Sequence, residues 1–151
     1  MSETLVNLYR SLRVEAFPHG AIIEAQPAPE ILYPDFEEKV LPNGNIRKAD
    51  VQFANPSPDS DDWVLAGGGT SLFDRANVFK GKSWISFEIP EGTVIPESLV
   101  VRNTGFNDRF QATHYQIEVK ARMMTVGAYK GALDNLARNA IARSVELGRL
   151  K

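Results

Sequence analysis

The chain has 151 residues, a net charge of −2 and no cysteine. This length predicts a single domain, residues 1–151, that buries its core without a disulfide or a metal. The lack of cysteine excludes thiol catalysis, cysteine–zinc sites and a disulfide scaffold. The slightly acidic charge gives no indication of nucleic-acid binding. We find no apolar run that could span a membrane and no signal peptide, so we expect a soluble domain without a membrane partner.

The first expected element is a strand over residues 4–14. Its apolar side chains recur with period two, and Arg10 falls on the same face as Leu8 and Leu12. A guanidinium on an apolar face needs a carboxylate, a phosphate or exposure at a strand end, because an unpaired buried charge is costly. A salt bridge within the fold and an anion-binding role are both consistent with this position.

The middle of the chain predicts irregular structure. Prolines recur between residues 18 and 42 and exclude a continuous helix. The pair Asn43-Gly44 predicts a hairpin that joins residues 39–41 to residues 46–53. Residues 55–62 predict an acidic surface loop that lacks the ligand spacing of a calcium site. Because the two histidines lie far apart in sequence, we expect no metal.

Three glycines at 67–69 precede Thr70 and Ser71. Glycines let a backbone approach a ligand closely, and Ser71-x-x-Asp74 matches a capping box, so we expect a helix over residues 71–78. A helix N-terminus behind a glycine turn presents free N–H groups to an anion. The alternative is a flexible loop followed by an ordinary helix cap. No P-loop lysine, dinucleotide-binding spacing or G-x-S-x-G elbow accompanies the glycines, so Ser71 is not expected to be an acyl nucleophile.

Further strands are expected at residues 83–89, 99–101 and 111–119. The last of them places an imidazole, an amide and a carboxylate on one face, contributed by His114, Gln116 and Glu118. Such a face is either a solvated surface or the wall of a ligand cleft. From chemistry alone, His114 could join the early arginine and the two hydroxyls in binding an anionic, nucleotide-like ligand.

The clearest helix spans residues 126–147, where apolar side chains recur with the 3.6-residue period, and Gly148 is its expected C-cap. Strands with few helices and no βαβ alternation predict an α+β fold around a mainly antiparallel sheet.

Four motifs in the last 85 or so residues resemble, in order and spacing, the second "type six exported" cytotoxic effector family of the bacterial type VI secretion system. They are Gly68-Gly69-Thr70-Ser71-Leu72-Phe73-Asp74-Arg75-Ala76, Phe87-Glu88-Ile89-Pro90-Glu91-Gly92-Thr93 with Ile95-Pro96, Gln111-Ala112-Thr113-His114-Tyr115, and Leu133-Asp134-Asn135-Leu136-Ala137-Arg138-Asn139-Ala140-Ile141. The N-terminal half matches essentially at Leu8-Tyr9-Arg10.

The resemblance implies an ADP-ribosyltransferase-toxin-like fold, a split antiparallel β-sheet core with flanking helices whose cleft holds NAD. It implies that Arg10, Thr70 and Ser71 bind NAD and that Ser71 and His114 are catalytic. Such transferases also use a glutamate to stabilise the charge that develops as nicotinamide leaves. Gln116-x-Glu118 has the usual spacing, but the toxin family does not keep an acid there.

The resemblance further implies a cytotoxic effector, NAD-dependent and without a metal. It would be held in the producer cytoplasm by a cognate immunity protein, exported by the type VI secretion machinery and active on an unknown target in the recipient cytoplasm. The missing family acid favours an alternative, a non-enzymatic toxin or nucleotide-binding module that occupies its target without turnover. A third interpretation is a secretion or adaptor domain without a ligand.

Overall fold

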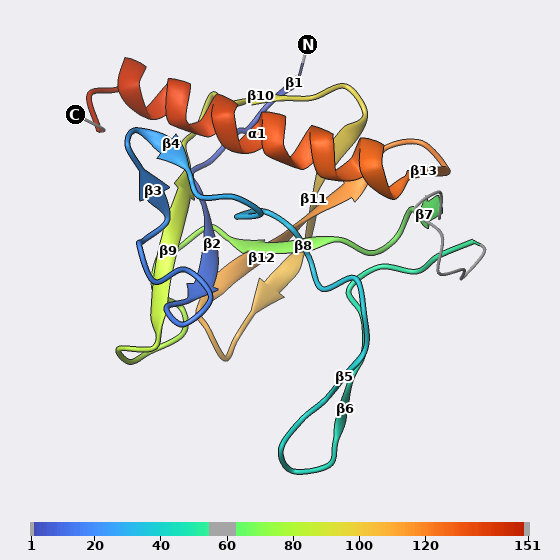
Figure 1. The fold of residues 1–151 in the computed structure, drawn as a ribbon. Coiled ribbons are helices and arrows are strands. Elements are labelled where there is room, and N and C mark those ends of the chain that lie inside the picture. The colour runs from blue at the N-terminus through green and yellow to red at the C-terminus, as the bar shows by residue number, and fades with distance from the viewer. Residues whose placement is uncertain (1, 55–62, 150–151) are drawn as a thin grey trace.

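The structure is a computed structural model that describes residues 2–54 and 63–149 (Figure 1). The acidic loop predicted at residues 55–62 lies outside the described residues. No helix of the described residues is long and apolar enough to cross a membrane.

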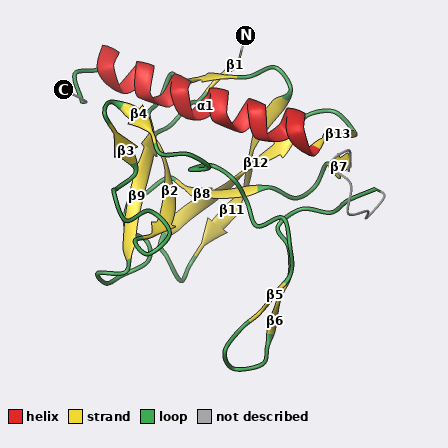
Figure 2. Ribbon diagram, viewed as in Figure 1, coloured by secondary structure: helices red, strands yellow, loops and turns green. Residues whose placement is uncertain are grey.

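A five-stranded antiparallel sheet forms the centre, and one helix lies across it (Figures 1 and 2). The strand order is β11–β12–β8–β2–β9. These elements are β2 (Leu8–Arg13), β8 (Thr70–Phe73), β9 (Trp84–Ile89), β11 (Leu99–Asn107), β12 (Ala112–Val119) and α1 (Val126–Glu146). The α+β class and the antiparallel sheet predicted from sequence are therefore confirmed, although α1 is the single α-helix within the described ranges.

Short strand pairs surround the sheet. The predicted Asn43-Gly44 hairpin is confirmed and projects away from the body (Figure 1), with Gly44 at φ +85°. The short strands are β1 (Ser2–Glu3) with β10 (Val94–Ile95), β3 (Ile22–Ile23) with β4 (Gln26–Pro27), β5 (Lys39–Val40) with β6 (Ile46–Arg47), and β7 (Trp63–Leu65) with β13 (Met123–Thr125).

The C-terminal helix agrees closely with its prediction. The Thr125 side chain accepts the N–H of Ala128 at the helix start, and Gly148 follows the C-cap with φ +71°. The predicted apolar stripe is buried except at Val145, which is 56% exposed. Helix α1 thus covers the sheet with most of the face that its 3.6-residue period predicts.

The helix predicted over residues 71–78 is wrong. Thr70–Phe73 forms β8, which pairs with β12 from His114↔Phe73 to Ile117↔Thr70. Leu72 enters the main core and Phe73 a second apolar cluster on the opposite face, and this alternation requires a strand. Asp74 is no helix cap, because its carboxylate accepts the N–H of Thr113. The proposed anion-binding helix N-terminus is therefore absent from this segment.

The sheet has two chemically different faces. The inner face, which packs against α1, carries the main apolar core, including Leu8, Phe87 and Ile117. The outer face carries the alternate residues of the same strands, among them His114 and Glu118. Half-buried and buried polar side chains therefore line part of the outer face, which excludes the interpretation of a fully solvated surface.

Gly69 permits β8 to lie against β12. A Cβ atom on Gly69 would overlap the backbone carbonyl oxygen of Ile117 and lie 3.1 Å from the Tyr129 hydroxyl. The glycine run thus serves close strand packing in this structure.

We predict that Gly69→Ala destabilises the fold by about 3 kcal/mol, because the added methyl group overlaps backbone that cannot move freely. Gly131→Ala is the matched control, since its Cβ meets open space in α1 and should stabilise by about 0.5–1 kcal/mol. Urea denaturation measures both, and equal stability of Gly69→Ala and wild type would contradict the packing role.

Candidate functional site

The central sheet is split between β2 and β8. Their register contains one residue pair, Tyr9↔Phe73, whereas β2 and β9 pair along all of β2. Beyond that pair the two strands diverge (Figure 1). The Arg10 guanidinium occupies the gap, where Nη1 donates to the Ser71 carbonyl oxygen at 3.2 Å and Nη2 to the Tyr33 carbonyl oxygen at 3.1 Å. An arginine side chain thus replaces the missing ladder hydrogen bonds.

Arg10 is a half-buried cation whose guanidinium donates to carbonyl groups. Burial lowers the pKa of Arg10, and the more distant carboxylates of Asp50 and Asp35 partly offset this effect. Arg10 makes no salt bridge with any residue that the structure describes. Its Nε is buried and has no hydrogen-bond partner among residues 2–54 and 63–149. This orphan donor fits an added anionic or ribose oxygen, as NAD would supply.

A segment that we call the strap, residues 28–36, covers the split on the inner face. The Thr70 hydroxyl donates to the Leu32 carbonyl oxygen of the strap at 2.6 Å, and Thr70 is fully buried. The Tyr33 hydroxyl donates to Asp134 of α1 at 3.0 Å, and burial together with this contact raises the pKa of Tyr33 to about 12. Thr70 therefore fastens the strap to the sheet rather than facing open space.

The predicted site residues lie on two faces of one sheet. Arg10 and Thr70 lie on the inner face, and Ser71 and His114 on the outer face. The Arg10 contact to the Ser71 carbonyl crosses the split and joins the two sets. The structure therefore brings Ser71 and His114 to neighbouring strands but separates Thr70 from both on the opposite face.

The imidazole of His114 is half-buried and held by Thr104. Nδ1 contacts the Thr104 hydroxyl, which lies 3.2 Å from the His114 carbonyl oxygen. A hydroxyl has one proton to donate. Both contacts are therefore hydrogen bonds only when the Thr104 hydroxyl donates to the His114 carbonyl oxygen and the Nδ1–H of His114 donates to the Thr104 oxygen. Nε2 is then an acceptor. Burial also lowers the pKa of His114, which favours the neutral imidazole at pH 7.

The carboxylate of Glu118 is buried on the outer face and already paired. Its Oε2 accepts from Arg102 Nη2 at 2.6 Å and from Gln116 Nε2 at 2.9 Å. Gln116 lies directly opposite Ser71 in the β12–β8 register, and its amide also reaches the Gly67 carbonyl oxygen at 3.4 Å. The ion pair orients Gln116 beside Ser71, so Glu118 is a fixed part of this face.

The sequence interpretation missed a second polar pair on this face. The Tyr9 hydroxyl donates to Glu88 at 3.0 Å, and Arg149 lies 3.4 Å from the other Glu88 oxygen. Burial and the adjacent Glu88 raise the pKa of Tyr9. The alternation of apolar and polar residues along β2 and β9 places Tyr9 and Glu88 away from the apolar face. This alternation was the signal in the sequence that could have identified them as outer-face residues. Only the register, which sets them opposite one another, could show that they meet.

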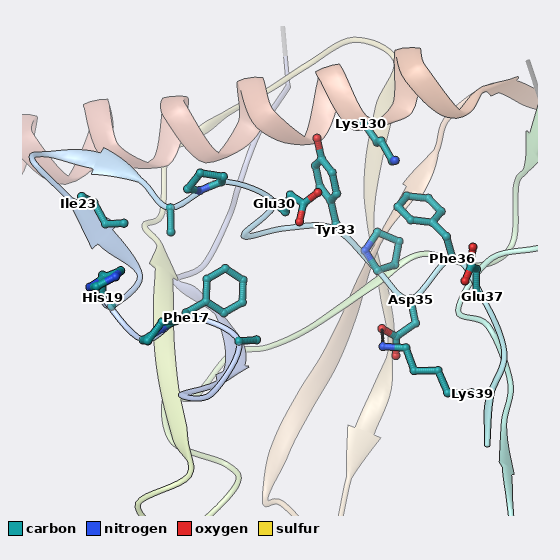
Figure 3. A pocket seen from close by; sticks show the side chains of 16 residues that line it. Phe17, His19, Ile23, Glu30, Tyr33, Asp35, Phe36, Glu37, Lys39 and Lys130 are labelled. Atoms are coloured by element: carbon teal, nitrogen blue, oxygen red, sulfur yellow. Dashed lines mark hydrogen bonds and ion pairs between the residues drawn. The ribbon is translucent and has the colours of Figure 1, made fainter. Parts of the chain in front are cut away.

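A cavity of about 630 Å³ lies elsewhere (Figure 3). Its wall includes Phe17, Tyr33 and Phe36, and the ammonium of Lys130 lies 5.6 Å and 5.1 Å from the centroids of the Tyr33 and Phe36 rings. None of the predicted site residues lines it. The cavity and the split are thus different features, connected through the strap.

Comparison with known proteins gives two agreeing findings. The family model described as "Tse2 ADP-ribosyltransferase toxin" matches residues 7–145. Toxin Tse2 of Pseudomonas aeruginosa (strain PAO1) is 37% identical over 132 residues, covering 87% of this chain and 80% of that protein. The match thus includes β2 and the strap as well as the motif-rich C-terminal half.

We predict that Thr70→Val lowers the free energy of unfolding by about 1–3 kcal/mol, because the Leu32 carbonyl oxygen loses its donor inside the core. Ser71→Ala, one residue away on the other face, should change stability by less than about 0.5 kcal/mol. Chemical denaturation of both variants decides the point. Equal effects would contradict the assignment of these residues to different faces.

We predict that His114 titrates below its ordinary pKa of 6.5 in an NMR titration of its ring protons. The unfolded chain takes up this proton near pH 6.5 but the folded chain does not, so stability is lost as pH falls from 6.5 toward the folded pKa. His114→Gln should abolish this part of the pH dependence, and the exposed-site control His19→Gln should retain it. A folded pKa above 6.5 would overturn the assignment.

Proposed function

This chain belongs to the Tse2 ADP-ribosyltransferase toxin family, and we propose that it is a cytotoxic effector that uses NAD as substrate. The observation that carries this proposal is the split sheet. Its gap holds a guanidinium whose Nε has no hydrogen-bond partner among the described residues. Ser71 lies on β8, which borders the gap, and His114 lies on the adjoining strand β12.

The residues of the split and the outer face supply the binding and proton chemistry. The chemistry that bound NAD supplies is transfer of ADP-ribose, with nicotinamide as the leaving group. Arg10 would donate from Nε to a phosphate or ribose oxygen. Ser71 and the fixed amide of Gln116 would orient the ligand from the outer face. His114, neutral and with Nε2 unprotonated, would accept a proton from the acceptor group.

Glu118 is the carboxylate available on this face for electrostatic stabilisation. It is buried, it lies on the strand of His114, and Arg102 fixes its orientation. The pair with Arg102 offsets its charge, which supports a positioning role through Gln116. Thr70 would act indirectly, because its hydroxyl is occupied by the strap.

We further propose the cellular setting that the family implies. The producer would keep the protein in its cytoplasm bound to a cognate immunity protein, and the type VI secretion machinery would deliver it to the cytoplasm of a recipient cell. The ion pair that occupies Glu118 favours one alternative, a non-enzymatic toxin that binds a nucleotide or its target without turnover.

We predict that expression in a bacterial cytoplasm arrests growth and lowers cellular NAD, and that Ser71→Ala and His114→Ala abolish both effects while remaining folded. Gly131→Ala, on the exposed side of α1, is the folded control and should stay toxic. Growth and NAD are followed together, and soluble protein is quantified by blotting.

The outcomes separate the alternatives. Growth arrest with constant NAD and no ADP-ribosylated product would support the non-enzymatic toxin. Normal growth with soluble wild-type protein would overturn the toxin assignment. Toxicity retained by folded Ser71→Ala would overturn the site.

A further inference from the structure

An aromatic cluster occupies the outer face beside the proposed site. It consists of four rings, Phe73, Phe79, Trp84 and Phe110, from β8, the loop after it, the start of β9 and the β11–β12 turn. Phe79 stacks on Trp84 with centroids 4.5 Å apart and an interplanar angle of 20°. Phe110 packs edge-on against Phe79 at 4.9 Å and against Phe73 at 5.3 Å. Phe79, Trp84 and Phe110 are each only half-buried.

The cluster is continuous with the proposed site. The Phe73 ring lies 5.1 Å from the His114 imidazole, centroid to centroid. Anything held over the rings is therefore next to the unprotonated Nε2 that we assign to proton transfer.

Two exposed cations contact the rings, and three more lie close to them in sequence. The Arg13 guanidinium lies 4.4 Å from the Trp84 ring centroid, and that of Arg109 lies 5.3 Å from the Phe110 centroid. The other three cations are Arg75, Lys80 and Lys82. Arg75 follows Asp74, Lys80 follows Phe79, and Lys82 lies two residues before Trp84. Within the described part of the chain, none of the five forms a salt bridge.

The local charge opposes that of the whole chain. Three acids, Glu15, Asp74 and Asp108, lie near the five cations in sequence, which leaves 5 − 3 = +2 in a chain of net charge −2. Asp74 is also occupied by the N–H of Thr113. The net charge therefore hides a basic region on the outer face.

We propose that this aromatic–basic patch, the four rings and five cations, binds a single-stranded nucleic acid and presents it to His114 as the acceptor. The acceptor role rests on the proposed transferase function, whereas the binding does not. A guanidinium stacked on a ring keeps its N–H edge free for phosphate, and its outer plane, like the exposed parts of the rings, is a surface on which a base can stack. An acidic protein would use the charges but not the rings, so the rings favour a nucleic acid.

The test measures binding without NAD, so that a failed transfer reaction does not affect it. The probes are a 16-nucleotide fluorescein-labelled RNA and the DNA of the same sequence, followed by fluorescence anisotropy between 50 and 200 mM salt. With five phosphate contacts, the slope of log K against log salt should be about −3.5 for a single strand. RNA preferred over DNA identifies the 2′-hydroxyl as part of recognition, and the reverse order identifies DNA as the ligand; either supports the patch. No saturable binding at 50 mM salt overturns the proposal.

Variants locate the surface. Arg13→Ala/Arg109→Ala should weaken binding at least tenfold and reduce the slope by about 1.4. Lys120→Ala/Arg122→Ala removes two exposed cations beyond the opposite end of β12 and should leave binding unchanged. Trp84→Leu should weaken binding severalfold with an unchanged slope, and its thermal melt confirms folding. If both double variants lose the same binding affinity, binding reflects charge attraction alone and the proposal is overturned. The same holds if polyglutamate displaces the labelled probe as effectively as unlabelled RNA does.

The wild-type protein separates this proposal from the one on which it rests. Wild-type protein that binds RNA but does not consume NAD refutes the transferase function alone. Wild-type protein that consumes NAD but does not bind RNA refutes the patch alone.

Discussion

The structure depends on a charge that no carboxylate of the described residues contacts. Arg10 lies where two strands of one sheet part, and the carbonyl oxygens of Ser71 and Tyr33 hold its guanidinium. Carbonyl dipoles solvate a buried cation less completely than a carboxylate or water would, which is why burial lowers the pKa of Arg10. The split cannot close into a regular ladder while this side chain occupies it, and an opening of that kind is what a ligand needs.

The strap connects the split sheet to helix α1. It is anchored by buried apolar side chains, by the Thr70 hydroxyl and by Tyr33, whose hydroxyl reaches Asp134. The strap and the apolar core cover the inner face at this point, whereas Ser71 and His114 lie on the outer face. The neighbours Thr70 and Ser71 thus have different tasks, because successive residues of a strand point to opposite sides of the sheet.

Period-two and 3.6-residue patterns predicted most strands, the C-terminal helix and the location of Arg10, because local periodicity determines which side chains share a face. The helix prediction for residues 71–78 was wrong because a capping box and the start of a strand look alike over four residues. Only the pairing with β12 distinguishes the two. Pairs such as Tyr9–Glu88 and Arg102–Glu118 join distant segments, so no local pattern contains them.

The contacts that complete the split span long stretches of chain. Arg10 and Ser71 are 61 residues apart, and Tyr33 and Asp134 are 101 apart. Topologies dominated by such pairings fold on a timescale of about milliseconds to seconds, because long loops must close first. On the ribosome, β2 and the strap emerge before their partners in β8, β9 and α1. The split and the strap that covers it therefore cannot form until most of the described chain has emerged.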